Sequence, residues 1–161
     1  LLSQLSHETV ESDYVTYLAQ DSELDLSPKP VRFYGDRNQI EQAVMNIVIN
    51  ASEAMPEGGR IVIQTRNVVL DYDDRMSLYG VKPGKYGELL ISDTGKGMGP
   101  FTLEKIFQPF FSTKQRGSIK GAGLGLSVVQ GIIESHGGHI KVESQPDKGT
   151  EFRIYLPAIV E

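Results

Sequence analysis

At 161 residues, the chain is long enough for one α/β domain of ordinary size with a substantial hydrophobic core. The absence of cysteine excludes disulfides and thiolate metal sites and suits a reducing compartment, while the formal net charge of −5 disfavours a nucleic-acid partner. No apolar run approaches the roughly 18 residues that span a bilayer, and the N-terminus lacks the pattern of a signal peptide.

The first 30 residues are expected to be a lead-in, the end of a preceding helical linker. Apolar residues between 1 and 20 recur only loosely at helical spacing, which fits a helix or an extended segment. Pro28 and Pro30 end this segment, because the residue before a proline is disfavoured in a helix. Residues 31–34 then alternate like a short strand. Since the chain begins abruptly with two leucines, we expect that it is part of a longer protein.

A long amphipathic helix is predicted next, ended by a Pro-Glu-Gly-Gly sequence. Asp36 and Gln39 have the spacing of a capping box at its start. Asn46 and Asn50 lie four residues apart, so their amides project side by side along the border of the apolar stripe. Buried amides cost free energy unless they are paired, so a polar group is expected against this helix. The stripe consists of Ile40, Val44, Ile47, Val48, Ala51 and Met55.

Four further strands are predicted, the first from its many β-branched residues, and helical spacing predicts a second long helix. A polar, acidic excursion separates the first two strands, and a Pro-Asp-Lys-Gly turn joins the last two. Gly137 and Gly138 supply a left-handed cap at the end of the helix. The strands are expected at 60–70, 86–93, 139–144 and 150–156, and the helix begins near 124.

Asp93 ends the second of these strands. Alternation places Leu89, Ile91 and Asp93 on one face, so the carboxylate points toward the interior and needs hydrogen-bond donors. The exocyclic amine of adenine is such a donor, whereas guanine presents a carbonyl oxygen, so ATP is preferred over GTP by roughly 1–3 kcal/mol. Gly95 and Gly97 let the backbone approach a flat ring closely. The alternative is a strand that simply ends in an Asp-Thr-Gly turn.

The connection between residues 95 and 125 is glycine-rich and long, which indicates a functional segment. Residues 121–126 offer backbone N–H groups just before a helix N-terminus, a favourable place for phosphate. Their spacing is neither that of a P-loop nor that of a dinucleotide fingerprint. Residues 106–114 are typical of a lid that phenylalanines anchor, with Lys114 facing phosphate oxygens. The cations Arg116 and Lys120 are more simply explained as part of a solvated surface.

Five motifs occur together and in order over residues 31–157, nearly the whole chain. They are Asn-x-x-x-Asn-Ala at 46–51, Asp-x-Gly-x-Gly at 93–97, Phe-x-Pro-Phe-Phe at 107–111, Gly-x-Gly-Leu-Gly-Leu at 121–126 and Gly-Thr at 149–150. This set resembles the N, first glycine, F, second glycine and third glycine boxes of the catalytic, ATP-binding domain of sensor histidine kinases. The resemblance implies the GHKL (Bergerat) fold, a two-layer α/β sandwich of a mixed sheet and helices with a flexible ATP lid. The lead-in 1–30 would precede this domain and a tail at 158–161 would follow it.

The resemblance also implies two cofactors, ATP and Mg²⁺, and a role for each motif. Asn50 would coordinate magnesium, with Asn46 supporting the metal and phosphates, and Lys114 would join them in catalysis. Magnesium takes few hard oxygen ligands from a protein, which suits a pair of amides. Ala122 departs from the threonine often found in the second glycine box. The nucleotide-binding residues would be Asn46, Asn50, Ala54, Asp93, Gly95, Gly97, Met98, Phe107, Lys114, Gly121, Gly123, Leu124, Gly125, Leu126 and Thr150.

Asn46 also discriminates between branches of the superfamily. Gyrase, the mismatch-repair ATPases and the anti-sigma serine kinases carry a glutamate four residues before the magnesium asparagine. An amide cannot accept a proton as a general base, so hydrolysis is disfavoured and transfer of the γ-phosphoryl group to an external nucleophile is favoured.

The partners follow from the same resemblance. The parent protein would be a homodimeric protein-histidine kinase, cytoplasmic or anchored in the inner membrane, and the isolated domain a monomer. It would phosphorylate a histidine on its separate dimerisation domain, and the phosphoryl group would pass to a response regulator. His7 resembles the start of that acceptor motif only superficially, because Thr9 and Val10 do not continue it. A second hypothesis is a non-catalytic nucleotide-binding or partner-docking module. His136 and His139 are expected to be a cap and a strand residue rather than metal ligands.

Overall fold

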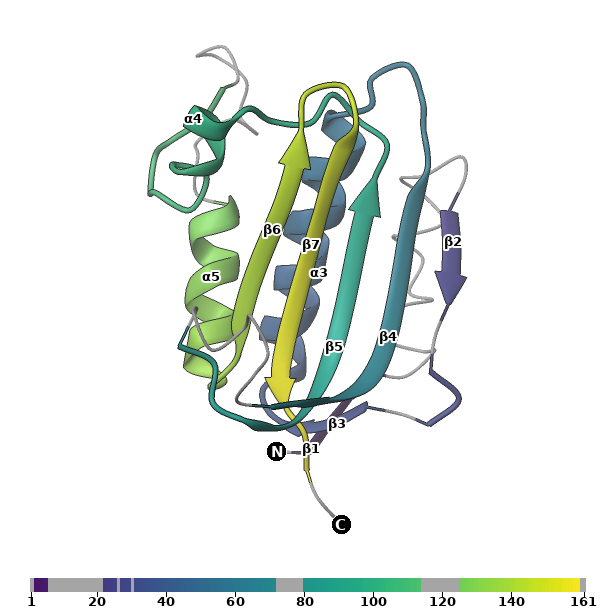
Figure 1. The fold of residues 1–161 in the computed structure, drawn as a ribbon, viewed down its shortest axis with the longest axis vertical. Coiled ribbons are helices and arrows are strands. Elements are labelled where there is room, and N and C mark those ends of the chain that lie inside the picture. The colour runs from purple at the N-terminus through teal and green to yellow at the C-terminus, as the bar shows by residue number, and fades with distance from the viewer. Residues whose placement is uncertain are drawn as a thin grey trace.

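The computed structural model describes residues 2–5, 22–25, 27–29, 31–71, 80–113 and 125–159. Its main feature is a five-stranded sheet in the order β2-β4-β5-β7-β6 (Figure 1). In this sheet β2 pairs in parallel with β4 and the other neighbours are antiparallel, so the sheet is mixed, as expected. The strands are β2 Ser22–Asp25, β4 Ile61–Leu70, β5 Gly84–Asp93, β6 His139–Gln145 and β7 Gly149–Pro157.

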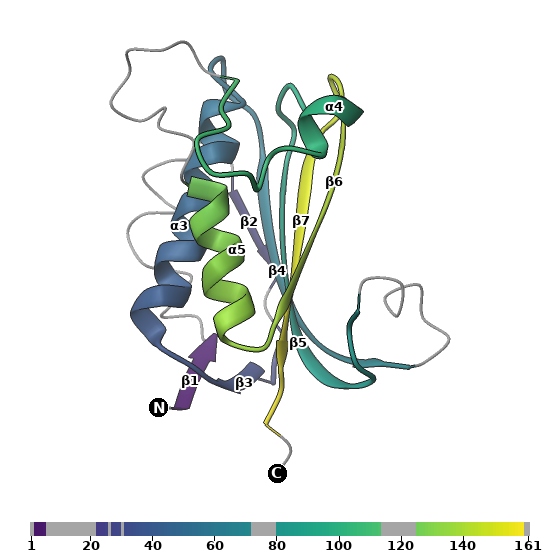
Figure 2. The same cartoon turned by 90° about the vertical axis from the view of Figure 1, so that its left-hand side faces the viewer.

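Helices cover one face of the sheet and make the second layer. The long helices α3 (Arg37–Glu53) and α5 (Gly125–Ser135) pack against the same face (Figure 2). A short helix, α4 (Pro100–Leu103), lies beside the C-terminal end of β6 (Figure 1). Strands β1 (Leu2–Leu5) and β3 (Val31–Tyr34) form a separate antiparallel pair. The predicted two-layer α/β sandwich is therefore confirmed.

The core lies between the sheet and the two long helices. Alternation along each strand places every second residue on the helix side, and branched apolar residues occupy those positions. The predicted stripe of α3 is buried there, apart from the half-buried Met55 at its end, which still packs against the core. The core residues less than 2% exposed include Phe33, Ala43, Ile47, Val48, Ile61, Ile63, Leu89, Ile91, Val129, Ile133, Ile154 and Leu156.

The start of α3 is capped in a different way from a full capping box. Asp36 Oδ1 accepts hydrogen bonds from the backbone N–H groups of Asn38 and Gln39, at 2.8 and 3.4 Å, as expected. The N–H of Asp36, which Gln39 would satisfy in a capping box, instead donates to His136 Nε2 at 3.0 Å. Nδ1 of that ring lies 2.7 Å from the carbonyl oxygen of Ile132. Because a carbonyl only accepts, the proton sits on Nδ1, and His136 joins the end of α5 to the start of α3.

Three elements of the described chain were not predicted as such from the sequence. Strand β1 lies in the lead-in and pairs with β3. Strand β2 lies in the lead-in and pairs with β4, in the register Ser22 to Ile61. Helix α4 lies in the glycine-rich connection, with Gly99 as N-cap and Pro100 at its first position. The remaining strands agree with prediction to within two residues, and the β6–β7 turn has positive φ angles at Asp147 and Gly149, of 62° and 87°.

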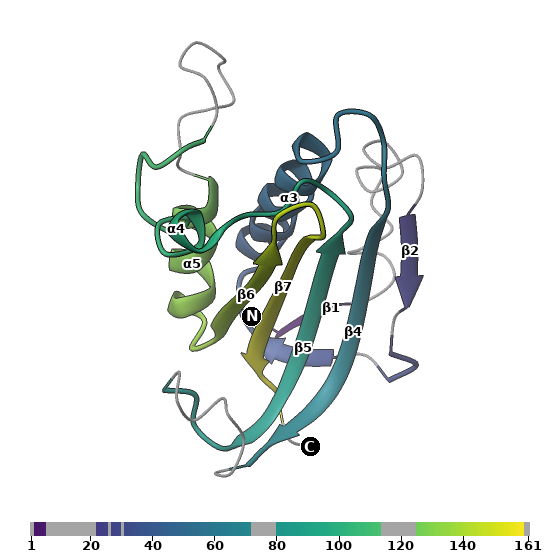
Figure 3. The ribbon, with the colours of Figure 1, turned by 45° about the horizontal axis from the view of Figure 1, so that its top comes forward.

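The described residues of the predicted motifs lie toward one end of the molecule (Figure 3). The C-terminal ends of α3 and β5, the start of α5, helix α4 and the β6–β7 turn all lie there. His136 and the start of α3 lie at the opposite end of the helical layer. The topology therefore brings residues from distant parts of the sequence to one edge of the sandwich.

Candidate functional site

Asp93 is the last residue of β5 and is only 9% exposed. Its Oδ1 accepts a hydrogen bond from the backbone N–H of Gly95 at 2.8 Å, and the backbone N–H of Thr150 donates to the same carboxylate. Burial raises the pKa of Asp93, and these two hydrogen bonds partly offset that rise. Two ionised carboxylate oxygens can accept about four hydrogen bonds, so this group retains acceptor capacity.

The loop after Asp93 is pressed against the end of α3. The N–H of Lys96 donates to the carbonyl oxygen of Ala54 at 3.1 Å, and a Cβ on Gly95 would lie 2.7 Å from the Ala54 Cβ. Gly97 has a φ of +61°, and a Cβ there would overlap the carbonyl oxygen of Gln145. Only glycine fits at these two positions, so the backbone of the loop is fixed close to its neighbours.

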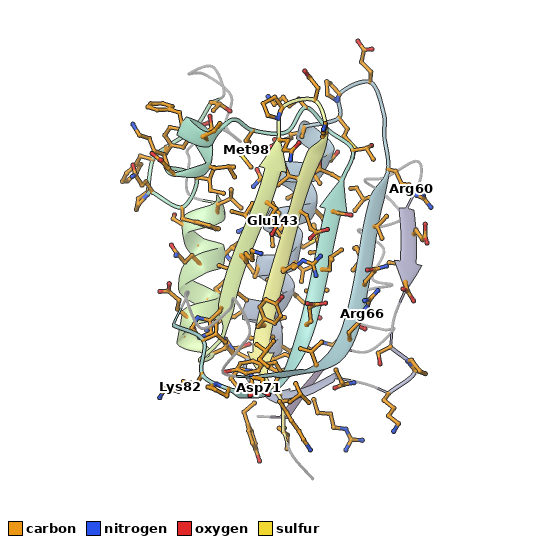
Figure 4. All side chains as sticks on the ribbon, viewed as in Figure 1. Arg60, Arg66, Asp71, Lys82, Met98 and Glu143 are labelled. Atoms are coloured by element: carbon orange, nitrogen blue, oxygen red, sulfur yellow. The ribbon has the colours of Figure 1, made fainter. Side chains whose placement is uncertain are left out.

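The β6–β7 turn supports the other side of that loop. The N–H of Asp147 donates to the carbonyl oxygen of Lys96 at 2.8 Å, and the N–H of Met98 donates to Ser144 Oγ at 2.8 Å. Ser144 Oγ also lies 2.8 Å from Thr150 Oγ1, and Thr150 is 7% exposed. Figure 4 shows Met98 beside this end of β6. The sequence analysis did not single out Ser144, which the observed register of β6 and β7 places opposite Thr150.

Asn46 and Asn50 lie one turn apart on α3, as predicted, but both are half-buried rather than buried. They are only half-buried because they lie at the border of the apolar stripe, on the part of the α3 surface that does not face the sheet. Asn46 Nδ2 donates to the carbonyl oxygen of Gly125 at 3.3 Å, which connects α3 to the first residue of α5. The Oδ1 atom of an amide used in this way remains an acceptor.

The phenylalanines of the expected lid differ from one another. Phe107 and Phe111 are half-buried and pack against the core. Phe110 is 78% exposed and has a φ of +63°, so the expectation that all three anchor the segment is wrong. Its backbone places the ring in solvent because the chain turns back at this position. Leu126 packs against the core from the first turn of α5.

Several predicted residues lie outside the described part of the chain. These are Lys114, Gly121, Gly123 and Leu124 of the predicted site, together with Arg116, Lys120, Ala122, His7 and the residues around it. The structure brings together Asp93, Gly95, Gly97, Met98, Thr150 and Ala54, and separately joins Asn46 to Gly125.

The Asp93 carboxylate and the amide oxygens of Asn46 and Asn50 are chemically suited to an adenine nucleotide with magnesium. A buried carboxylate held by backbone N–H groups can accept from the adenine amine, and half-buried amide oxygens are the hard ligands that magnesium takes. Among the described residues, no three His, Cys, Asp or Glu side chains gather at metal-binding distance. None of the helices in the described ranges is long and apolar enough to cross a membrane.

Comparison with known proteins identifies similar sequences over most of the chain. The family model of histidine kinase-, DNA gyrase B- and HSP90-like ATPases matches residues 35–159. Sensor kinase CckA of Brucella abortus is 44% identical over 126 residues, which cover 78% of this chain and 13% of that protein. Sensory histidine kinase/phosphatase NtrB of Escherichia coli O157:H7 is 35% identical over 134 residues, 83% of this chain and 36% of that protein. The chain thus spans well under half the length of these relatives.

Solved structures with the same fold are also histidine kinases. The mycobacterial sensor histidine kinase MprB superposes with a TM-score of 0.75 at 28% identity, covering 100% of both chains. The catalytic domain of histidine kinase ThkA gives a TM-score of 0.74 at 28% identity, covering 98% of this chain and 96% of that one.

Proposed function

The chain belongs to the family of histidine kinase-, DNA gyrase B- and HSP90-like ATPases, and we propose that it is the ATP-binding catalytic domain of a sensor histidine kinase. In the parent protein it transfers the γ-phosphoryl group of ATP to a histidine on a separate dimerisation domain. A response regulator then receives the phosphoryl group. The similarity to sensor kinases over nearly four fifths of the chain supports this function.

The single observation that carries the proposal is the environment of Asp93. The carboxylate is buried, and in the described part of the chain its hydrogen bonds come from the backbone N–H groups of Gly95 and Thr150. A buried carboxylate without a cationic partner gains most from a neutral donor such as the adenine amine. Gly95 and Gly97 form the backbone next to that base, with Ala54 and Met98 beside them.

The phosphate end of the site is assigned to α3 and the start of α5. Mg–ATP supplies the γ-phosphoryl group together with a cation that neutralises phosphate charge. Asn50 offers its amide oxygen to the metal, and Asn46 is the second candidate. Lys114, Gly121 and Gly123 complete this end of the site in the proposal, with Leu124, Gly125 and Leu126 following them, and Phe107 anchors the lid.

Asn46 favours transfer over hydrolysis. Its Nδ2 donates a hydrogen bond to the carbonyl oxygen of Gly125. Its amide oxygen is too weakly basic to accept a proton from water. The chain's own residues therefore bind and orient the nucleotide, while the nucleophile comes from outside the described residues. We further propose that the parent protein is a homodimer and that this domain acts in the cytoplasm.

Calorimetric titration with ATP tests the binding part of the proposal. Asn50→Ala should lower the affinity measured with magnesium at least about tenfold, and should have little effect when the metal is chelated. Asn38→Ala is the matched control, because Asn38 lies on the same helix at its exposed first turn. Unchanged affinity of Asn50→Ala in magnesium would rule out the metal assignment.

Transfer is tested in the parent protein with radiolabelled ATP. Acid-labile, alkali-stable label on a histidine supports the kinase function. Tight ATP binding without any labelled histidine would instead favour the non-catalytic, partner-docking alternative.

A further inference from the structure

We propose that Ser144 sets the direction of the hydrogen bond made by the Thr150 hydroxyl, and through it helps the site select a base that carries an amino group. Ser144 lies on β6, outside all five sequence motifs. This inference rests on the proposed function and deepens it by naming a positioning residue that determines base specificity.

Three groups surround the Ser144 hydroxyl at hydrogen-bond distance. The backbone N–H of Met98 donates to Ser144 Oγ at 2.8 Å. The carbonyl oxygen of Gly149 lies 2.9 Å from the same atom, and Thr150 Oγ1 lies 2.8 Å from it. A serine hydroxyl has one hydrogen to donate and two lone pairs that accept, so three partners use its full capacity.

The direction of each hydrogen bond follows from the chemistry of the partners. The carbonyl of Gly149 can only accept, so the single Ser144 hydrogen must point to it. The N–H of Met98 can only donate and takes one lone pair of Ser144. The contact to Thr150 is then satisfied only if the threonine hydroxyl donates to the remaining lone pair. The reverse direction would place two oxygen lone pairs face to face at 2.9 Å, with no hydrogen between Ser144 and Gly149.

The result is that the hydroxyl of Thr150 presents only lone pairs to the rest of the site. Thr150 and Asp93 are directly paired residues of the neighbouring strands β7 and β5, and both are buried on the helix side of the sheet. The Asp93 carboxylate is also acceptor-only when ionised. The side chains of Asp93 and Thr150 therefore offer two adjacent acceptors at this end of the site.

Two adjacent acceptors discriminate between purines by their hydrogen-bonding edges. At position 6 adenine carries an amine that donates, whereas hypoxanthine carries a carbonyl oxygen. Both acceptors are assigned to position 6, where they attract the adenine amine and repel the hypoxanthine carbonyl; the neighbouring N1 has the opposite character in the two bases. Without Ser144, the Thr150 hydrogen is free to rotate and donate to that carbonyl. Ser144 thus acts through Thr150 and has no need to touch the nucleotide.

The experiment compares ADP and IDP, which differ only in the base, by calorimetry on the whole chain. Ser144→Ala should reduce the ratio of ADP to IDP affinity roughly five- to tenfold, the effect of about one hydrogen bond. Ser144→Thr keeps the hydroxyl on a residue that strands favour and should retain the ratio of the wild type. In a Thr150→Val background, Ser144→Ala should produce no further change in the ratio, because the group through which Ser144 acts is gone.

Two outcomes would overturn the inference while leaving the proposed function intact. One is an equal loss of ADP and IDP affinity in Ser144→Ala, which indicates only general support of the loop. The other is an additive effect of Ser144→Ala in the Thr150→Val background. If the wild-type chain binds neither nucleotide, the proposed function itself fails and the inference with it.

A measurement without nucleotide checks the hydrogen-bond network directly. Amide hydrogen exchange at Met98 should accelerate in Ser144→Ala and stay slow in Ser144→Thr, since the acceptor for its N–H is lost only in the first. Unchanged exchange in Ser144→Ala would contradict the network from which the inference starts.

Discussion

Strand β5 carries two buried carboxylates, Glu88 and Asp93, which are 7% and 9% exposed and lie on opposite faces. Glu88 faces away from the helices, where Arg153 Nη1 lies 3.5 Å from its Oε2. Tyr155 lies beside it, and burial together with the Glu88 charge raises the pKa of that tyrosine to about 12. Asp93 faces the helices and is held by backbone N–H groups.

The difference between the two carboxylates lies in their partners, because their burial is nearly the same. A charged partner from the chain compensates the charge of Glu88, which makes the pair a structural contact. Burial raises the pKa of Asp93, and in the described part of the chain it is offset only by hydrogen bonds from neutral backbone N–H groups, so the carboxylate gains from a further donor. The type of hydrogen-bond or ion-pair partner therefore distinguishes Glu88, a structural carboxylate, from Asp93, a candidate binding carboxylate.

The largest expected effect comes from exchanging Asp93 for its neutral isostere. Asp93→Asn should lower ATP affinity about tenfold to a hundredfold, corresponding to about 1–3 kcal/mol, because an amide NH₂ can face the adenine amine without accepting from it. Glu88→Gln is the matched control on the same strand and should leave affinity unchanged. Calorimetry measures the ATP affinity of both variants. Equal affinities would show that Asp93 and Glu88 do not differ in their role in binding.

A second change tests the structural carboxylate. Arg153→Met leaves Glu88 buried without its cation and should lower the free energy of unfolding by about 1–2 kcal/mol, with ATP affinity unaffected. Lys141→Met is the control, because it removes a more exposed ion pair with Glu143 and should cost less than about 1 kcal/mol. Figure 4 shows Glu143 on the face of the sheet turned away from the helices. Urea denaturation measures both, and an equal loss in the two variants would contradict the proposed role of Glu88.

The contribution of Asp93 to stability should change with pH in the opposite direction to that of the exposed Glu143. Burial raises the folded-state pKa of Asp93 above its ordinary value of 3.8, so stability from this group falls as pH rises through that window. The Lys141 ammonium lowers the pKa of Glu143, so stability from that group is lost as pH falls. Asp93→Asn should therefore gain stability relative to wild type as pH rises from about 3 to 7, and Glu143→Gln should lose it. Parallel curves for the two variants would contradict this assignment.

Local patterns predicted most of the fold. The stripe of α3, the β-branched run of β4, strand β5 and the turn between β6 and β7 are each encoded within a few neighbouring residues, and these predictions are confirmed. Strand β2 is different, because its four residues gain their hydrogen bonds from β4, almost forty positions away. No local pattern carries that information.

The candidate site was predictable where a residue type is unusual for its position. Asp93 follows two core residues, and Asn46 interrupts an apolar helix, so each attracts notice. Ser144 has no unusual feature in the sequence, and its importance is visible only from its contacts with Thr150 and Met98 in the structure. Gln39 had the correct spacing for a capping box, but His136, a hundred positions from Asp36, takes the hydrogen bond instead.

Helix α5 is tied to α3 at both ends, by His136 at its C-terminal end and by Gly125 at its N-terminal end. The imidazole of His136 holds the last turn of α5 against the start of α3, while the first residue of the 11-residue helix, Gly125, meets Asn46 at the other end. At about 1.5 Å per residue, the helix is about 15 Å long, so a tilt of about 10° displaces Gly125 by about 3 Å. Such a displacement would separate Gly125 from Asn46 while His136 stays bonded, which makes the asparagine sensitive to small rotations of the whole helix.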